Sequence, residues 1–93
     1  TIVPLGVGVS LSKYVAACEK VLDRPGLTTQ LHPNGTSIEG EWNEVFDAVR
    51  ACHDVVHEMG APRIHTVIKL STRTDREQTM QDKLDSVREK MSD

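Results

Sequence analysis

The dipeptide Asn34-Gly35 restricts the fold of this chain more than any other short stretch. Both residues tolerate positive φ, so Asn-Gly between two strand-like runs is the strongest short-range signal of a tight β-hairpin. Thr28–His32 is the predicted strand before the turn, and residues 36–39 form the predicted strand after it. Gly40 then breaks the second strand ahead of a helix, which limits the length of the hairpin.

Polar side chains gather on this hairpin. The turn places His32 and Glu39 on neighbouring strands, with the hydroxyls of Thr36 and Ser37 between them. An imidazole, a carboxylate and hydroxyls on one strand pair could bind a small polar molecule, or they could form a solvated sheet face. Glu39 carries the most weight, because a strand-end carboxylate can accept hydrogen bonds from the N–H groups of a ligand. An ordinary exposed acid is the alternative.

Length and composition limit the classes of protein to which this chain can belong. Its 93 residues suffice for one domain with one core, and 38% hydrophobic and 27% charged residues are ordinary for a globular protein. The net charge of −3, with acids and bases interspersed, argues against nucleic-acid binding, which needs a basic face. No apolar run approaches the roughly 18 residues of a membrane span, and no signal peptide is visible. We therefore expect one cytoplasmic domain over residues 1–93, without nucleic-acid or membrane partners.

Two cysteines, Cys18 and Cys52, lie far apart in the sequence, each within a helical pattern. The chain has no C-x-x-C spacing and no disulfide framework of the kind found in small secreted domains. We therefore expect two buried free thiols, as in a reducing cytosol.

The first segment, residues 1–9, alternates apolar residues with Pro4, Gly6 and Gly8, which predicts a strand with one apolar and one bare face. Pro4 has no N–H, so it should lie where no ladder partner needs one. The two glycines either let a ligand or a second sheet approach the backbone closely, or mark a kinked strand start. The sequence leaves both interpretations open.

Two helices with apolar stripes are predicted from the spacing of the hydrophobic residues. We expect the first helix after a Ser10 or Ser12 cap, ending at residues 24–26. We expect the second helix over Glu41–Met59, with acids in its first turn and Gly60 as its stop.

A fourth strand and a last helix complete the predicted elements. Residues 63–70 alternate as a strand, residues 71–76 form a polar loop, and Thr74 or Asp75 caps the last helix. The apolar stripe of that helix is narrow and consists of Met80, Leu84, Val87 and Met91. We expect the helix to cover a small area or a neighbouring subunit.

The predicted order β-α-β-β-α-β-α is that of an α+β, ferredoxin-like split β-α-β sandwich (βαββαβ) with an extra C-terminal helix. Such a fold has one antiparallel four-stranded sheet with two helices on one face. The other face is left open, and packing on a second copy of the chain is the natural way to cover it. We therefore expect a homodimer formed through the sheet face.

Other groups could carry chemistry, each with an ordinary alternative. His53 and His57 have metal-ligand spacing on the second helix, but no third ligand is suitably spaced, so polar-face histidines are the simpler interpretation. The basic residues Lys69, Arg73 and Arg76 could bind a phosphate or carboxylate, or serve solubility. The acids around the last helix are too loosely spaced to indicate an acid–base pair.

Nothing in the chain requires an enzyme. There is no phosphate-binding loop, no dinucleotide fingerprint, no nucleophile elbow and no supported Cys-His pair. We expect no catalytic residues and no metal site.

Several stretches together resemble one family, the small thiamine-binding (YkoF-like) proteins. Residues 31–42 are similar to the hairpin signature of that family, and residues 60, 63–69, 72–75 and 83–87 agree with its second half. The opening residues 3–6 fit as well, so the resemblance covers essentially the whole chain. Ser37 departs from it, because threonine or an apolar residue is frequent at that position.

The resemblance implies a fold, an assembly and a ligand. It implies a ferredoxin-like fold, dimers packed through their sheets, and commonly a dimer of dimers, that is, a homotetramer. It implies binding of thiamine or its hydroxymethylpyrimidine half, with no catalysis and no cofactor beyond that ligand. The positions that it assigns to the ligand site are His32, Asn34, Gly35, Thr36 and Glu39, with Thr66 and Lys69 nearby.

Two other functions compete with ligand binding. The chain could be an oligomeric assembly or regulatory module without a small-molecule ligand. It could also be a small acylphosphatase-like enzyme, since those enzymes share the architecture. They need an arginine in a phosphate loop after the first strand, and residues 6–12 contain none.

Overall fold

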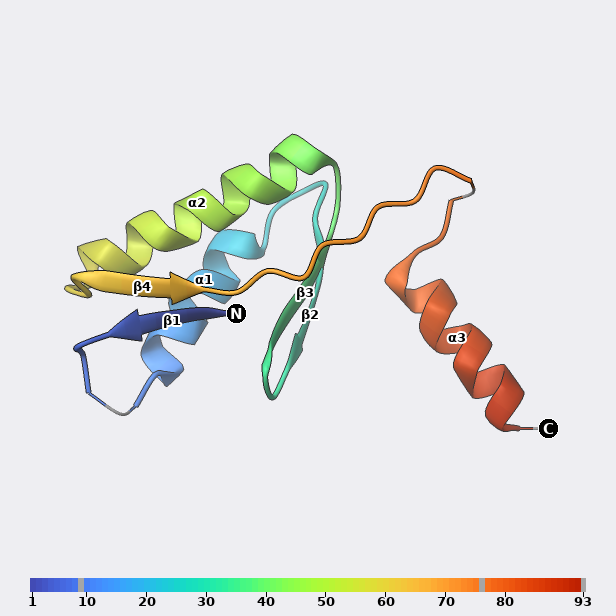
Figure 1. Cartoon of the computed structure of the whole chain (residues 1–93), viewed down its shortest axis with the longest axis horizontal. Helices are drawn as coiled ribbons and strands as arrows, with labels where there is room; N and C mark the ends of the chain where they lie inside the picture. Colours follow the sequence, from blue (N-terminus) through green and yellow to red (C-terminus); the bar gives the residue numbers. More distant parts are fainter. Residues whose placement is uncertain (9, 76, 93) are drawn as a thin grey trace.

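The computed structural model describes residues 1–8, 10–75 and 77–92, which form four strands and three helices (Figure 1). Their order is the predicted one, which confirms an α+β fold with an extra C-terminal helix. The elements are β1 (Ile2–Leu5), α1 (Ser12–Leu22), β2 (Thr28–His32), β3 (Gly35–Glu39), α2 (Trp42–Glu58), β4 (Arg63–Thr66) and α3 (Met80–Met91).

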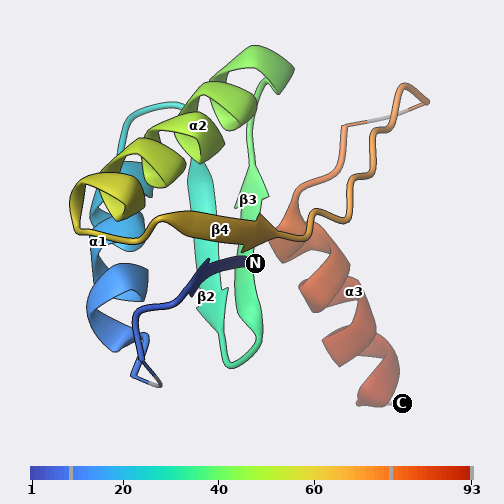
Figure 2. The ribbon, with the colours of Figure 1, turned by 60° about the vertical axis from the view of Figure 1, so that its left-hand side comes forward.

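The strands form two separate antiparallel ladders, β1 with β4 and β2 with β3. Figure 2 shows the two pairs crossing at a steep angle. The prediction of one four-stranded sheet is therefore wrong for the described residues, because no ladder joins β1 to β3.

Pro4 gives the physical reason for the missing ladder. Thr1 and Val67 exchange two backbone hydrogen bonds, of 2.8 and 2.9 Å. Because bonded and non-bonded pairs alternate along an antiparallel ladder, the backbone groups of Ile2 and Pro4 point to the other edge of β1. Pro4 has no N–H to donate there. The outer edge of this four-residue strand therefore has few backbone groups that could form a ladder with another strand. This agrees with the prediction that Pro4 lies where its missing N–H is not needed.

The bare face of the first segment is explained by a turn. β1 ends at Leu5, because Gly6 and Gly8 take positive φ values of 78° and 97°, which are not strand conformations. A Cβ added to Gly8 would meet no atom within 4 Å, and one added to Gly6 would meet only Pro62 Cγ, at 3.9 Å. The glycines therefore allow a turn rather than a close approach. Val9, predicted as the end of the strand, lies outside the described residues.

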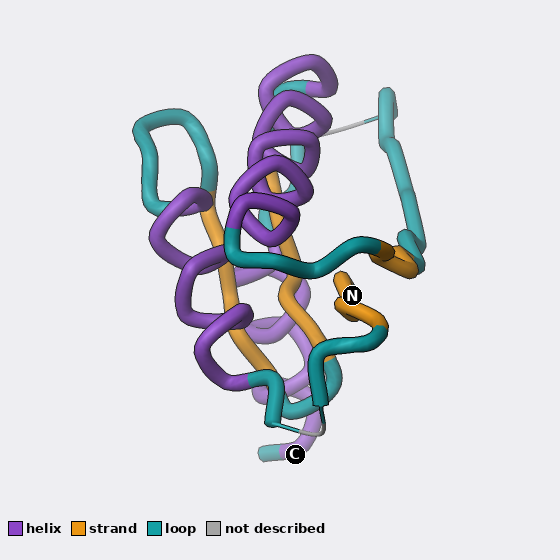
Figure 3. Tube along the Cα trace, turned by 90° about the vertical axis from the view of Figure 1, so that its left-hand side faces the viewer, coloured by secondary structure: helices purple, strands orange, loops and turns teal. Residues whose placement is uncertain are grey.

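Both helices expected to carry apolar stripes pack on the same side of both ladders (Figure 3). One core cluster joins Tyr14, Val56 and Ala61, and Ile64 of β4 packs against it. The other joins Leu22, Ala48 and Cys52, and Ile2 of β1 and Ile38 of β3 pack against it. Strand residues from both ladders thus contact α1 and α2, so the two helices lie together as predicted, but over two ladders and not over one sheet.

The helix starts differ in how well the sequence predicted them. Glu41, predicted in the first turn of the second helix, is instead the N-cap of α2, and its carboxylate accepts hydrogen bonds from the N–H groups of Asn43 and Glu44. The prediction of a Ser10 or Ser12 cap for α1 is wrong, since Leu11 occupies the N-cap position without a side-chain hydrogen bond. The side chain of Leu11 instead packs against the first core cluster, so burial decides this boundary.

The prediction of a Thr74 or Asp75 cap for α3 is also wrong. Thr79 is the N-cap, and it forms a reciprocal capping box with Asp82, whose two hydrogen bonds are both 3.0 Å. Such a box satisfies two N–H groups at once, so the helix begins there. No residue of α3 is buried, and Met91 is 78% exposed.

Thr79→Ala should destabilise α3 by about 1 kcal/mol, the usual cost of losing an N-cap hydroxyl. α3 has 12 residues and little packing, so its helicity depends on local interactions. Backbone chemical shifts of residues 80–84 report the loss of helix directly. Ser71→Ala, in the exposed segment before α3, should leave those shifts unchanged.

β4 is shorter than predicted. It ends at Thr66, whose ladder partner is Ile2, the first residue of β1, and Val67 exchanges backbone hydrogen bonds with Thr1 just beyond the ladder. Val67, Ile68 and Leu70 are each about half exposed, at 52%, 50% and 54%. The segment from there to α3 contains no helix or strand among its described residues.

Candidate functional site

The β2–β3 hairpin places His32 and Glu39 on neighbouring strands, as predicted, but its loop consists of Pro33 and Asn34, because Gly35 is already the first residue of β3. His32 lies opposite Gly35, and Thr28 lies opposite Glu39. The two candidate side chains are therefore at opposite ends of the ladder, four residues or about 13 Å apart along the strand. A single pyrimidine ring cannot contact both of them.

Alternation along β3 separates the hydroxyl of Thr36 from Glu39. Ile38 packs in the core, so Thr36 and Ile38 face the helices, whereas Glu39 lies on the opposite face of the hairpin. His32 shares the outer face with Glu39, because it is paired with Gly35, four residues before Glu39 on β3. The structure thus brings His32 and Glu39 to one face but places Thr36 on the other.

The hydroxyl of Thr36 is already engaged. It donates a hydrogen bond of 2.6 Å to Oε1 of Glu19 on α1, in a part-buried position. Glu19 was missed by the sequence analysis, although a signal exists: it lies within the apolar stripe of α1, one residue after Cys18 and three before Leu22. An acid on a core-facing stripe indicates a polar partner on the opposite layer.

Thr66 has a partner on α2. Its Oγ1 lies 2.6 Å from Nε2 of His53, so it too faces the helices. His57 donates from Nδ1 to the backbone oxygen of Ala61 over 2.7 Å, which satisfies a carbonyl just beyond the end of α2. Among the described residues no group of three or more His, Cys, Asp or Glu side chains could hold a metal ion.

The hairpin turn lies against the start of β1. Thr1 Oγ1 donates to the backbone oxygen of Asn34 over 2.9 Å, and the backbone nitrogen of Thr1 donates to the backbone oxygen of Val67. A Cβ added to Gly35 would lie 2.8 Å from Thr1 Oγ1, so the turn has no room there for a side chain. Asn34 and Gly35 are thereby brought close to the end of β4, from which Lys69 follows.

Glu39 accepts a hydrogen bond within the chain. Its Oε2 lies 2.5 Å from the backbone nitrogen of Met80, the first residue of α3, and the contact is part-buried. The carboxylate is therefore presented to an N–H donor, as its predicted role requires, but the donor in this structure belongs to α3.

All seven predicted ligand residues border one open hollow of about 1720 Å³. That volume exceeds the roughly 300–1,000 Å³ of ordinary ligand pockets. The single chain therefore does not enclose a small molecule at these residues. They are His32, Asn34, Gly35, Thr36, Glu39, Thr66 and Lys69.

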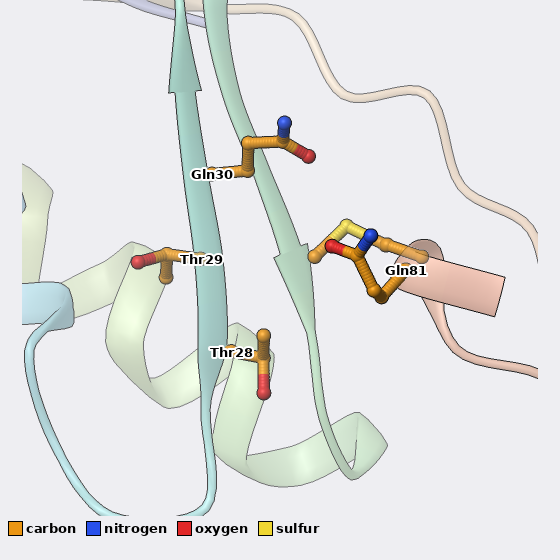
Figure 4. Close-up of a pocket in the computed structure, with 5 residues that line it drawn as sticks. Thr28, Thr29, Gln30 and Gln81 are labelled. Carbon is orange, nitrogen blue, oxygen red and sulfur yellow. The ribbon is translucent and has the colours of Figure 1, made fainter. Parts of the chain in front are cut away.

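A smaller hollow of about 260 Å³ lies between β2 and the first turn of α3 (Figure 4). Thr28, Thr29 and Gln30 form one wall, and Met80 and Gln81 form the other. Because Thr28 is the cross-strand partner of Glu39, this hollow adjoins the Glu39 end of the hairpin.

The predicted basic cluster is only partly described. Lys69 and Arg73 border the same large hollow, and Arg73 forms an ion pair of 2.6 Å with Asp75. Arg76 lies outside the described residues.

Both cysteines are free, as predicted, with Cys52 buried and Cys18 half-buried. The Cys52 thiol on α2 lies 3.8 Å from the backbone oxygen of Cys18 on α1. A hydrogen bond with Cys18, together with burial, raises the pKa of Cys52, and the same hydrogen bond lowers the pKa of Cys18. Cys52 is therefore held as a thiol inside the core.

A protein-family model described as Thiamine-binding protein matches residues 1–88 of the chain. The chain belongs to the thiamine-binding protein family. This confirms the resemblance inferred from the hairpin and the second half of the sequence. The family name describes binding and not a reaction.

Relatives from distant organisms share this family. A UPF0045 protein of Synechocystis sp. is 59% identical over 86 residues, which cover 92% of this chain and 71% of the relative. The UPF0045 protein ECM15 of Eremothecium gossypii is 47% identical over 92 residues, covering 98% and 88%. The crystal structure of a hypothetical protein from Methanocaldococcus jannaschii matches with a TM-score of 0.86 at 32% identity, covering 96% of this chain and 91% of that one. That likeness supports the ferredoxin-like arrangement of this thiamine-binding family member.

Proposed function

We propose that this protein binds thiamine or its hydroxymethylpyrimidine half without catalysing a reaction. The observation that carries the proposal is the match of the thiamine-binding family over residues 1–88. Its role would be that of a carrier, sensor or buffer of the vitamin.

The chemistry of the outer hairpin face supports this ligand. An aminopyrimidine presents an exocyclic amine beside a ring nitrogen, and a carboxylate can accept from that edge. Glu39 provides the carboxylate, and it already accepts a backbone N–H in this structure. We place the pyrimidine at the Glu39 end of the hairpin, beside Thr28. The second ring of thiamine would then extend towards His32.

The remaining predicted positions would act from other sides of the large hollow. Thr36 and Thr66 lie on the helix side, where Glu19 and His53 hold their hydroxyls. Asn34 and Gly35 shape the turn, and Lys69 would meet an anionic group if a phosphorylated form is the ligand.

Isothermal titration calorimetry with thiamine and with hydroxymethylpyrimidine tests the proposal. Saturable binding of either compound supports it, and a tighter fit of thiamine indicates that both rings contact the protein. An absence of heat at millimolar ligand, with the protein folded, contradicts it. An assembly module without a ligand would then be the better description, because half-exposed apolar residues such as Val67, Ile68 and Leu70 fit that function equally well.

We propose further that the protein is a homodimer or homotetramer in the cytoplasm. Large apolar side chains are exposed both on the segment after β4 and on α3, where Val87 is 57% exposed. A partner copy would cover them and would narrow the open hollow to the size of a ligand pocket. Among the described residues, no helix combines the length and the apolar character that crossing a membrane requires.

Light scattering at micromolar concentration should report two or four times the mass of one chain. The apolar side chains that a monomer would expose to water are the physical reason for this expectation. A mass equal to one chain would contradict the proposed assembly.

A further inference from the structure

The link between α3 and the rest of the molecule is slight. Within the described part of the chain, the hydrogen bond from Met80 to Glu39 is the one that ties α3 to the β2–β3 hairpin. No residue of α3 is buried. Figure 1 shows α3 set apart from the other elements at the end of a long connecting segment.

We propose that α3 is a displaceable arm whose docking excludes the ligand from Glu39. This inference rests on the proposed function. The carboxylate of Glu39 accepts a hydrogen bond from the N–H of Met80. An N–H donor of the ligand would take the same position on that carboxylate. Ligand binding therefore requires that α3 leave the hairpin.

The space around Glu39 supports mutual exclusion. The hollow on the Thr28 side has about 260 Å³, below the roughly 300–1,000 Å³ of ligand pockets, whereas Glu39 and Met80 themselves border the larger open hollow. The outer wall of the smaller hollow consists of Met80 and Gln81, the first two residues of α3 (Figure 4). Outward movement of this wall enlarges the hollow and exposes the carboxylate at the same time.

α3 can move as a unit because residues of its own first turn cap it. Thr79 and Asp82 satisfy each other's backbone N–H groups, so the helix does not need Glu39 as a cap. The segment before it, residues 67–79, contains no helix or strand among its described residues and can act as a tether. Within the chain, displacement therefore costs the bond to Glu39 and few other contacts.

Met80→Pro and Met80→Ala form a matched pair that tests the exclusion. Met80 is the first helical residue, where proline is favoured because that N–H has no partner within the helix. Thr79, with φ −89° and ψ 165°, already has the extended conformation that precedes a proline. Proline removes the donor to Glu39, whereas alanine removes the same side chain and keeps the donor.

The proline variant should bind thiamine about three- to tenfold more tightly than the alanine variant in calorimetry, the effect of deleting one competing hydrogen bond. Equal affinities would overturn the exclusion and leave the proposed function intact. If neither variant nor the unmodified protein binds thiamine, both proposals fail.

Hydrogen exchange of the unmodified protein gives an independent readout. Saturation with thiamine should move the Met80 amide resonance and speed exchange along α3, while the amides of α2 keep their protection. Unchanged exchange of Met80 at saturation would show that the arm stays docked and would overturn the inference even if the variants misfold.

Discussion

Leu22→Ala is expected to lower the free energy of unfolding by about 3 kcal/mol. Leu22 is 5% exposed and packs with Ala48 and Cys52, and Ile2 and Ile38 from the two ladders pack against the same cluster. Alanine would leave a cavity at the point where α1, α2 and both ladders meet. Because small domains have only about 5–15 kcal/mol of stability, this is a large fraction of the total.

Urea denaturation followed by circular dichroism measures the effect, at one fixed protein concentration because oligomers gain stability with concentration. Arg50→Ala is the control, since Arg50 is exposed on α2 outside the core clusters and should change stability by less than about 0.5 kcal/mol. Equal effects of the two changes would show that the Leu22 cluster is not the core of the fold.

Glu39→Gln is expected to weaken thiamine binding by about 1–3 kcal/mol, or about 5- to 150-fold in Kd. Glutamine keeps the shape of the side chain and one acceptor oxygen, but it loses the charge that strengthens a hydrogen bond from an N–H donor. The backbone bond from Met80 can still form, so the fold should remain intact.

Glu58→Gln is the control for the change of net charge. Glu58 is exposed at the last position of α2 and borders neither hollow. It should leave the Kd within about twofold, the range expected for a remote surface charge in salt. An unchanged Kd for Glu39→Gln would remove Glu39 from the site.

Short sequence patterns predicted the strands and helices whose ends are determined by residues close to them in the sequence. The β2–β3 hairpin and the approximate span of α2 could be predicted, because turn residues and acids near the helix start mark them, although the loop consists of Pro33 and Asn34 and Gly35 already belongs to β3. The ends of β1 and β4 could not, since a strand extends only as far as its partner. Gly6 leaves the strand conformation at one end, and the ladder with β4 stops at the pair of Ile2 with Thr66 at the other.

The candidate site was predicted in part for a related reason. Thr36 and Glu39 are close in the sequence. They are three positions apart on one strand, however, so their side chains lie on opposite faces. The partners Glu19 and His53 come from helices whose rotation over the strands is decided by packing, which no local pattern specifies. The contact of Glu39 with Met80 joins residues 41 positions apart and likewise has no local signal.

Binding of the ligand at the Glu39 end of the hairpin is tested most directly by an NMR titration of the isotope-labelled protein with thiamine. The largest amide shifts are expected at Thr28, Glu39 and Met80, with smaller ones towards His32, and all should saturate together with the calorimetric Kd. Saturable shifts confined to residues away from the β2–β3 hairpin, or no shifts at millimolar thiamine, would contradict binding at this site.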